Sequence, residues 1–116
     1  MIEIVRGDTL KLSFTRLDSN GDAIKSTPSA IYFTVKDSTS SNTVLFQKTI
    51  EDMSMNSETG KWTFYITPSD TNELYYGSYK YDIEVKDILD EQEYTKTIAI
   101  GDFKIKEEVT FVSDEV

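Results

Sequence analysis

The sequence contains no cysteine and no histidine among its 116 residues. Thiolates and imidazoles serve as nucleophiles, general bases and zinc ligands, so their absence excludes Ser-His and Cys-His catalysis, zinc clusters, disulfides and thiol redox pairs. Carboxylates remain for acid–base chemistry, but the Asp and Glu residues that can be placed fall on solvent-facing strand positions or in loops. We therefore expect no enzyme activity, no catalytic residues, no metal site and no cofactor.

Positive charge is also scarce, with 12 Lys and Arg against 21 Asp and Glu, a formal net charge of -9 and a pI of about 4.4. Nucleic-acid binding gains much of its affinity from Lys and Arg that contact phosphates, and anionic membranes repel the same negative charge. Apolar runs extend over only a few residues, far short of the roughly 20 that span a bilayer. We expect neither nucleic acid nor a membrane as a partner.

Apolar residues recur with a period of two, which is typical of strands with one buried face. The clearest alternation has Tyr79, Tyr81, Ile83 and Val85 on one side and charged residues on the other. The same pattern predicts three more strands, with these inward residues: Leu10, Leu12 and Phe14; Ile31, Phe33 and Val35; Trp62, Phe64 and Ile66.

Weaker patterns predict strands at residues 2–5, at 43–50 with Val44 and Phe46 inward, and at 94–105. In the last segment the apolar residues Ile98 and Ile100 have even numbers, whereas the later ones, Phe103 and Ile105, have odd numbers. One inserted residue explains this change, and we predict a β-bulge at Gly101 that keeps both halves inward. A short turn between two separate strands is the alternative.

Loops are predicted at residues 18–22, 37–42, 53–60 and 87–93, the last of them an acidic hairpin tip. A short helix is predicted after Thr67, which suits an N-cap, because Pro68 fits the first helical position and Asp70 can return a hydrogen bond to the cap. Gly77 should end this helix in a left-handed conformation. Tyr79, two residues later, matches the tyrosine corner of immunoglobulin-like sandwiches, where a Tyr hydroxyl ties a strand to the preceding loop.

These elements predict an all-β fold, namely an immunoglobulin-like antiparallel β-sandwich of seven to eight strands with one short helix before a late strand. The length suits a single domain over residues 1–116. A small closed barrel has the same periodicity and stays open as an alternative.

Tyr32 and Tyr65 fall at outward positions of their strands, whereas Trp62 shares the inward parity of Phe64. Tyrosine is favoured at protein contacts because it covers a large area at low entropic cost. We predict Tyr32 and Tyr65 as protein-contact residues. A carbohydrate platform formed by Trp62, Tyr32, Tyr65, Tyr75 and Tyr76 is the alternative interpretation.

Several segments occur together in a characteristic order and spacing: Arg6-Gly7-Asp8-Thr9; Asn20-Gly21-Asp22; Ile31-Tyr32-Phe33-Thr34-Val35-Lys36; Leu45-Phe46-Gln47-Lys48-Thr49; Thr67-Pro68-Ser69-Asp70-Thr71 with Leu74, Gly77 and Tyr79 to Ile83; Lys96-Thr97-Ile98; Gly101-Asp102-Phe103-Lys104-Ile105; and Val109-Thr110. Together they resemble the immunoglobulin-like N-terminal domain of phage baseplate upper proteins and related small phage tail proteins of phages that infect Gram-positive bacteria.

The resemblance implies a structural protein of the phage tail or baseplate that positions receptor-binding components and has no catalytic residues to carry over. Its partners would be other phage tail or baseplate proteins, and a homo-oligomer is also open. The expected location is the virion, after synthesis in the host cytoplasm, since the first residues lack the pattern of a secretory signal. A carbohydrate- or cell-wall-binding module of a bacterial surface protein is the alternative function.

Overall fold

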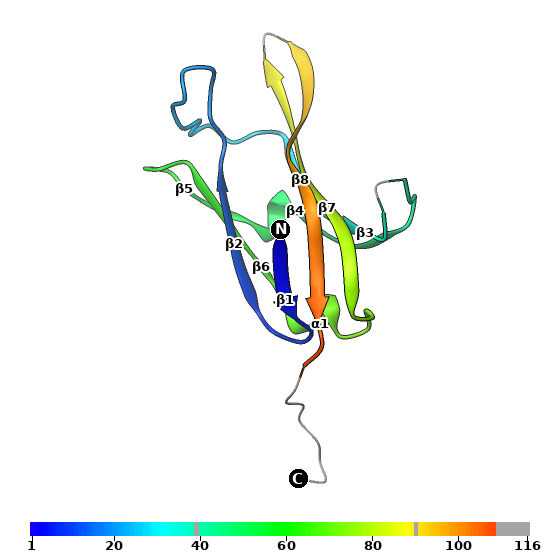
Figure 1. Ribbon diagram of the computed structural model, residues 1–116. Helices are drawn as coiled ribbons and strands as arrows, with labels where there is room; N and C mark the ends of the chain where they lie inside the picture. The colour runs from blue at the N-terminus through cyan, green and yellow to red at the C-terminus, as the bar shows by residue number, and fades with distance from the viewer. Residues whose placement is uncertain (39, 90, 109–116) are drawn as a thin grey trace.

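The structure, a computed structural model, describes residues 1–38, 40–89 and 91–108, and these form a two-layer β-sandwich (Figure 1). The larger sheet has the strand order β1 (Ile2–Val5), β8 (Gln92–Lys106), β7 (Gly77–Leu89), β3 (Ala30–Lys36) and β4 (Val44–Thr49). The smaller sheet has the order β2 (Leu10–Thr15), β6 (Lys61–Ile66) and β5 (Ser54–Asn56). A 3-10 turn, η1 (Ile50–Asp52), follows β4, and the helix α1 (Pro68–Thr71) precedes β7. The predicted all-β sandwich with one short helix is confirmed.

β2, β5 and β6 face β3, β7 and β8, as strands B, D and E face strands C, F and G in the immunoglobulin fold, and β4 adds a strand beside β3, as in the variable type of that fold. One pairing departs from the expected antiparallel arrangement, because β1 runs parallel to β8 with Ile2 opposite Phe103. β1 therefore joins the larger sheet and does not pair with β2, the next strand along the chain.

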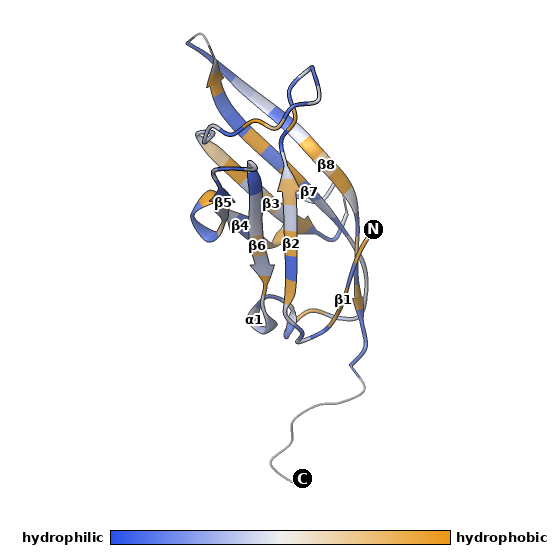
Figure 2. Ribbon diagram, turned by 90° about the vertical axis from the view of Figure 1, so that its left-hand side faces the viewer, coloured by the Kyte–Doolittle hydropathy of each residue, from blue (hydrophilic) through white to orange (hydrophobic). Residues whose placement is uncertain are grey.

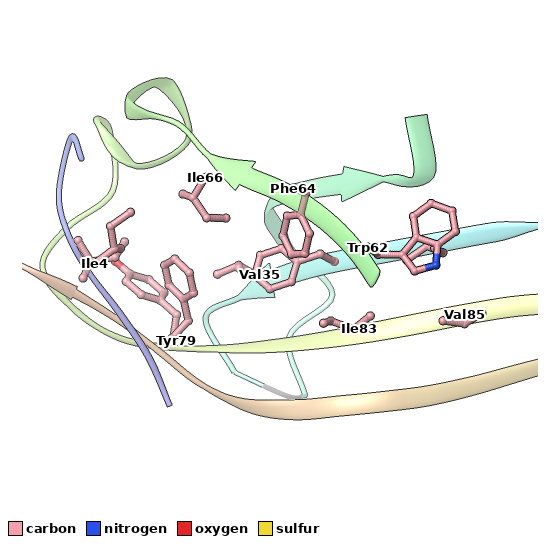
Figure 3. Packing of buried hydrophobic residues seen from close by; sticks show 12 residues of the cluster. Ile4, Val35, Trp62, Phe64, Ile66, Tyr79, Ile83 and Val85 are labelled. Carbon is pink, nitrogen blue, oxygen red and sulfur yellow. The ribbon is translucent and has the colours of Figure 1, made fainter. Parts of the chain in front are cut away.

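The core lies between the sheets and consists mainly of the predicted inward residues (Figure 3). Phe33 is fully buried at its centre, and its ring centroid lies 5.0 Å from that of Phe64 and 5.6 Å from that of Tyr81. Hydrophobic and hydrophilic residues alternate along the strands in Figure 2. Leu10, Leu12 and Phe14 face the core as predicted but are only half-buried, because β2 is an edge strand.

The β-bulge of β8 lies at Ile98, so the prediction of a bulge at Gly101 is wrong. Glu84 pairs with Thr97 and Ile83 with Ala99, which leaves Ile98 as the extra residue. Ile100 then points outward and is 66% exposed. Gly101 pairs regularly with Tyr81, whose Cε1 would lie 3.1 Å from a Cβ at this position. The glycine is therefore explained by close approach of an aromatic ring and not by an irregular backbone.

A second irregularity changes the expected orientation of Val44. Val35 pairs with Phe46 and Lys36 pairs with Val44, so Leu45 is the extra residue in β4. Phe46 packs against the core as predicted, but Val44 lies opposite Lys36 and is 47% exposed. The inserted residue moves Val44 to the outer face, since one residue reverses the side of a strand to which a side chain points.

The helix α1 begins as predicted but does not end at Gly77. The Asp70 carboxylate accepts a hydrogen bond of 2.7 Å from the backbone N–H of Thr67, which closes the capping box. The single helical turn ends at Asn72 in a right-handed conformation, and Gly77 is the first residue of β7 with a φ of +145°. The expected left-handed ending is therefore wrong, because the chain leaves the helix before it reaches the glycine.

Two predicted loops contain strand residues. β5 lies within residues 53–60. The predicted hairpin tip at 87–93 does join two strands, but β7 extends to Leu89 and β8 begins at Gln92, so the tip is shorter than expected. The turn at residues 18–22 forms as predicted, with Asp18 Oδ1 accepting hydrogen bonds from the backbone N–H groups of Asn20 and Asp22. Val109 and Thr110, part of the sequence resemblance, lie outside the described residues.

Candidate protein-contact surfaces

Tyr32 lies on the outer face of the larger sheet, as predicted, and is half-exposed there. Its neighbours across the strands are Thr49 of β4 and Glu84 of β7. The side chain stands between two shallow hollows of about 310 and 340 Å³, and it lines both of them. A partner side chain can enter either hollow and contact the ring.

Exposed apolar residues share this outer face with charged ones. Ile100 of β8 and Val44 of β4 are 66% and 47% exposed, and each borders a hollow on this face. Asp102 forms an ion pair with Lys80, and the hydrogen bond from this lysine lowers the pKa of the Asp102 carboxyl. The face therefore combines apolar contact area with charges that are already matched within the sheet.

Tyr65 lies on the outer face of the smaller sheet, opposite Lys11, and is 47% exposed. On the same face the hydroxyls of Ser13 and Thr63 lie 3.2 Å apart. The strands of this sheet contain lysines but no Asp or Glu. Tyr32 and Tyr65 belong to opposite faces of the sandwich, so the structure does not bring the two predicted contact residues together.

Of the predicted structural residues, Tyr79 makes the bond described for a tyrosine corner. Its hydroxyl donates a hydrogen bond of 2.6 Å to the carbonyl oxygen of Tyr75. Burial, and secondarily the charge of Asp37, raise the pKa of this hydroxyl. Gly77 and Gly101 lie in regular pairing with Ile105 and Tyr81 respectively.

A partly buried ion pair at one end of the sandwich was not predicted from the sequence. Arg16 is only 8% exposed, and its Nη1 lies 3.2 Å from Asp87 Oδ2, while its Nη2 donates a hydrogen bond of 2.7 Å to the Ser26 carbonyl. The sequence does indicate that both side chains point inward. Arg16 falls at the next inward position after Leu10, Leu12 and Phe14. Asp87 falls at the next inward position after Ile83 and Val85.

The ion pair lines an apolar cavity of about 240 Å³ between the end of β2 and the β7–β8 hairpin. Leu17 and Tyr94 form part of its wall and are 59% and 52% exposed. The Arg16 Nε atom is buried without a hydrogen-bond partner among the described residues. Sequence periodicity gives no measure of such a cavity, because its walls come from segments far apart in the chain.

Arg6 and Gly7 hold the opposite end of the sandwich together. The Arg6 guanidinium donates hydrogen bonds of 2.5 and 3.2 Å to the two carboxylate oxygens of Glu108, and it lies 4.4 Å from the centroid of the Tyr76 ring. The backbone N–H of Gly7 donates a hydrogen bond of 3.0 Å to the hydroxyl of the fully buried Thr71. These contacts join the end of β1 to the α1–β7 connection and to the residues after β8.

Neither a protein-family model nor a curated protein matches this chain. No helix in the described part of the chain is long and apolar enough to cross a membrane. Residues 1–38, 40–89 and 91–108 also hold no group of three or more His, Cys, Asp or Glu side chains that could bind a metal ion.

Proposed function

We propose that this chain is a structural protein of a phage tail or baseplate, where it makes protein–protein contacts and helps to position receptor-binding components. The sequence resemblance supports the phage context. The contact role is carried by one observation, the position of Tyr32 between two hollows on the outer face of the larger sheet.

Tyr32 is well placed to act as a rigid contact residue. Its neighbours Ile31 and Phe33 point into the core and are fully buried, so the backbone beneath the tyrosine is fixed. A preorganised aromatic side chain loses little conformational entropy on binding. Ile100 and Val44 add exposed apolar area on the same face. A stable interface formed through this face would bury on the order of 1,000 Å² or more.

The charge of this face also suits a protein contact. The whole chain carries a net charge of -9. On the outer face of β3 and its neighbours β4 and β7, however, strand alternation places Lys36, Lys80 and Lys86 with Asp82 and Glu84, and Lys80 also forms an ion pair with Asp102 of β8. Near neutrality avoids the desolvation of unmatched charge when a partner covers the sheet.

The aromatic residues give no comparable support to the carbohydrate-binding alternative. Trp62 is 4% exposed and packs in the core, where its ring stacks on Phe14 with 6.5 Å between centroids. Tyr32 and Tyr65 lie on opposite outer faces. A sugar would therefore find no platform formed by Trp62, Tyr32 and Tyr65. The other two aromatic residues considered from the sequence, Tyr75 and Tyr76, are 85% and 43% exposed, but the Arg6 guanidinium lies 4.4 Å from the centroid of the Tyr76 ring and occupies one of its faces.

The test is to purify phage particles from a lysed host that carries the gene and to measure the copies of this chain per particle by mass spectrometry. We expect the chain in the particles and a loss of incorporation of about tenfold or more for Tyr32→Ala, as for a central interface aromatic. Tyr75→Ala is the matched control, since this tyrosine is 85% exposed in a loop. Particles that lack the chain would overturn the phage assignment. Unchanged incorporation of Tyr32→Ala would overturn the assignment of this face.

A further inference from the structure

The free strand edges of this sandwich are not equally protected. An exposed edge offers unpaired backbone N–H and C=O groups to other chains, and proteins protect such edges with short strands, bulges or inward-pointing charges. β1 and β5 have four and three residues, and β4 carries an extra residue at Leu45. The free part of β8 contains the bulge at Ile98, and Lys96 beside it lines the cavity between the sheets.

β2 is less protected, because it has neither a bulge nor an inward-pointing charge within its own residues, although Lys11 lies on its outer side and the inward Arg16 follows its end. It is a regular strand of six residues, without proline, and its inward residues are Leu10, Leu12 and Phe14. Among the described residues, its backbone pairs with β6 alone, and no other backbone hydrogen bond reaches it. In an antiparallel ladder every second residue directs its N–H and C=O to the other side, so β2 presents a continuous open edge. Figure 2 shows β2 at the margin of the smaller sheet, with β6 on one side.

The apolar row along β2 is incompletely covered. Leu10, Leu12 and Phe14 are half-buried, whereas Ile66, Phe64 and Trp62, which lie opposite them on β6, are between 0% and 4% exposed. The row continues into the cavity of about 240 Å³ that begins at Arg16 and Leu17 and is bounded across the sandwich by Tyr94 and Ile98. An added strand would bury this row and direct side chains toward the cavity.

The charge near the open edge of β2 indicates which kind of segment can bind there. The smaller sheet contains Lys11 and Lys61 and no acid, and Lys96 lines the cavity beside the edge. Neither Lys11 nor Lys96 forms an ion pair with a described carboxylate. A second copy would bring another net charge of -9, which disfavours self-association through long-range repulsion. The edge instead suits a segment that carries its own carboxylates.

We propose that β2 accepts an extended segment of a partner protein, with apolar residues at alternate positions and acidic residues at its ends, as the fourth strand of the smaller sheet. Backbone hydrogen bonds would supply affinity, and the half-buried row and the cavity would select the side chains. This inference rests on the proposed function in one respect, which is that the chain acts through contacts with other proteins.

The absence of cysteine makes a direct test practical. The Ser13→Cys variant places a single thiol on β2, and the matched Thr63→Cys variant places one on the central strand β6. The two positions lie directly opposite each other on the same outer face, but both edges of β6 are occupied. The probe is a synthetic peptide of alternating valine and threonine, with glutamate at both ends and one central cysteine, in a buffer of reduced and oxidised glutathione, where the oxidised form accepts the two electrons released by disulfide formation.

We expect the Ser13→Cys variant to hold the peptide by disulfide exchange about tenfold better than the Thr63→Cys variant, because only β2 can pair with it. Amide hydrogen exchange in Leu10–Thr15 should slow in the captured complex. A peptide with prolines at the pairing positions and one with lysine in place of glutamate should both lose most of the advantage.

Equal capture by the two variants, or undiminished capture of the proline or lysine peptide, would overturn the inference. A concentration-dependent dimer of the unmodified chain, with β2 amides protected, would also overturn it and assign the edge to a second copy. The experiment uses the purified chain without phage particles. Its failure therefore leaves the Tyr32→Ala result on virions intact, and absence from virions leaves the capture result intact.

Discussion

The hydroxyl of Tyr79 donates a hydrogen bond of 2.6 Å to the carbonyl oxygen of Tyr75, four residues earlier in the chain. Tyr79 belongs to β7 and is 9% exposed, whereas the Tyr75 side chain is 85% exposed. The bond gives a buried hydroxyl its partner and fixes the α1–β7 connection to the strand that follows it. Tyr79 therefore couples packing of the core to the position of an exposed loop.

Replacement of Tyr79 by phenylalanine tests this bond. The Tyr79→Phe variant keeps the buried ring but loses the donor, and we expect the free energy of unfolding to fall by about 1 kcal/mol. Urea denaturation monitored by circular dichroism measures the change. Tyr94→Phe is the control, since Tyr94 is 52% exposed, and it should change stability by less than about 0.5 kcal/mol. Equal effects of the two substitutions would contradict a structural role of the Tyr79 hydroxyl.

Gly101 should be intolerant of a side chain because of Tyr81. A Cβ at position 101 would lie 3.1 Å from Tyr81 Cε1, and the Tyr81 ring is itself held against Phe33 at 5.6 Å between centroids. We expect Gly101→Ala to destabilise the protein by about 1–2 kcal/mol through overpacking. In a Tyr81→Leu background the same substitution should cost much less. Additive effects in this double-mutant cycle would show that the cost has another origin.

The Arg16–Asp87 pair should show strong non-additivity. Asp87→Leu leaves the guanidinium of Arg16, which is 8% exposed, without its carboxylate, and we expect a loss of about 2–3 kcal/mol. The double variant Arg16→Met with Asp87→Leu removes both charges from an apolar cavity and should recover most of that loss. Thermal and urea denaturation of the three variants measure the coupling. A double variant less stable than Asp87→Leu alone would contradict this expectation.

Asp70 should contribute to stability in a pH-dependent way. Burial raises the pKa of its carboxyl, but the ion pair with Lys48 at 2.7 Å and the hydrogen bonds from Thr67 outweigh burial, so the net pKa is lowered. The contribution is therefore complete above the unfolded-state pKa of about 3.9 and is lost as the pH falls through the lower folded-state value.

The Asp70→Asn variant measures this contribution. We expect it to be less stable than the parent chain by about 1–2 kcal/mol near neutral pH, since it loses the ionised carboxylate of the capping box and the Lys48 pair. The difference in urea denaturation should shrink as the pH is lowered below about 4. A difference that stays constant across this range would contradict the assignment of an ionised, bonded Asp70.

Strand alternation predicted which residues enter the core but not where each strand becomes irregular. The change of parity in β8 was visible in the sequence, yet the bulge lies at Ile98 and leaves Ile100 exposed. The glycine at position 101 suggested a bulge there, whereas its role is to accommodate the ring of Tyr81. A change in the alternation along β8 shows that one residue is inserted. Which residue is inserted depends on how β8 pairs with β7, and the sequence of β8 alone does not show this.

The residues of the candidate surfaces also fall into two groups, those that strand alternation predicted and those that it did not. Alternation placed Tyr32 and Tyr65 on outer faces, as the structure does. Arg16 and Asp87 were not predicted to be inside, since Asp87 falls in a predicted loop, although both continue the inward alternation of their strands. That Arg16 and Asp87 meet is a consequence of two strands from different sheets reaching the same end of the sandwich. A single strand's periodicity carries no information about what lies across the core from it.

The sequence by itself determined the class of fold, the inward rows of the four clearly alternating strands and the start of α1, since these depend on alternation and on local hydrogen bonds between neighbouring residues. The tertiary structure alone decided that β1 pairs with β8, that β2 keeps an open edge, and that a cavity forms beside Arg16. Those features depend on pairing between distant segments, whose energies are set by the neighbours that each edge finds in space.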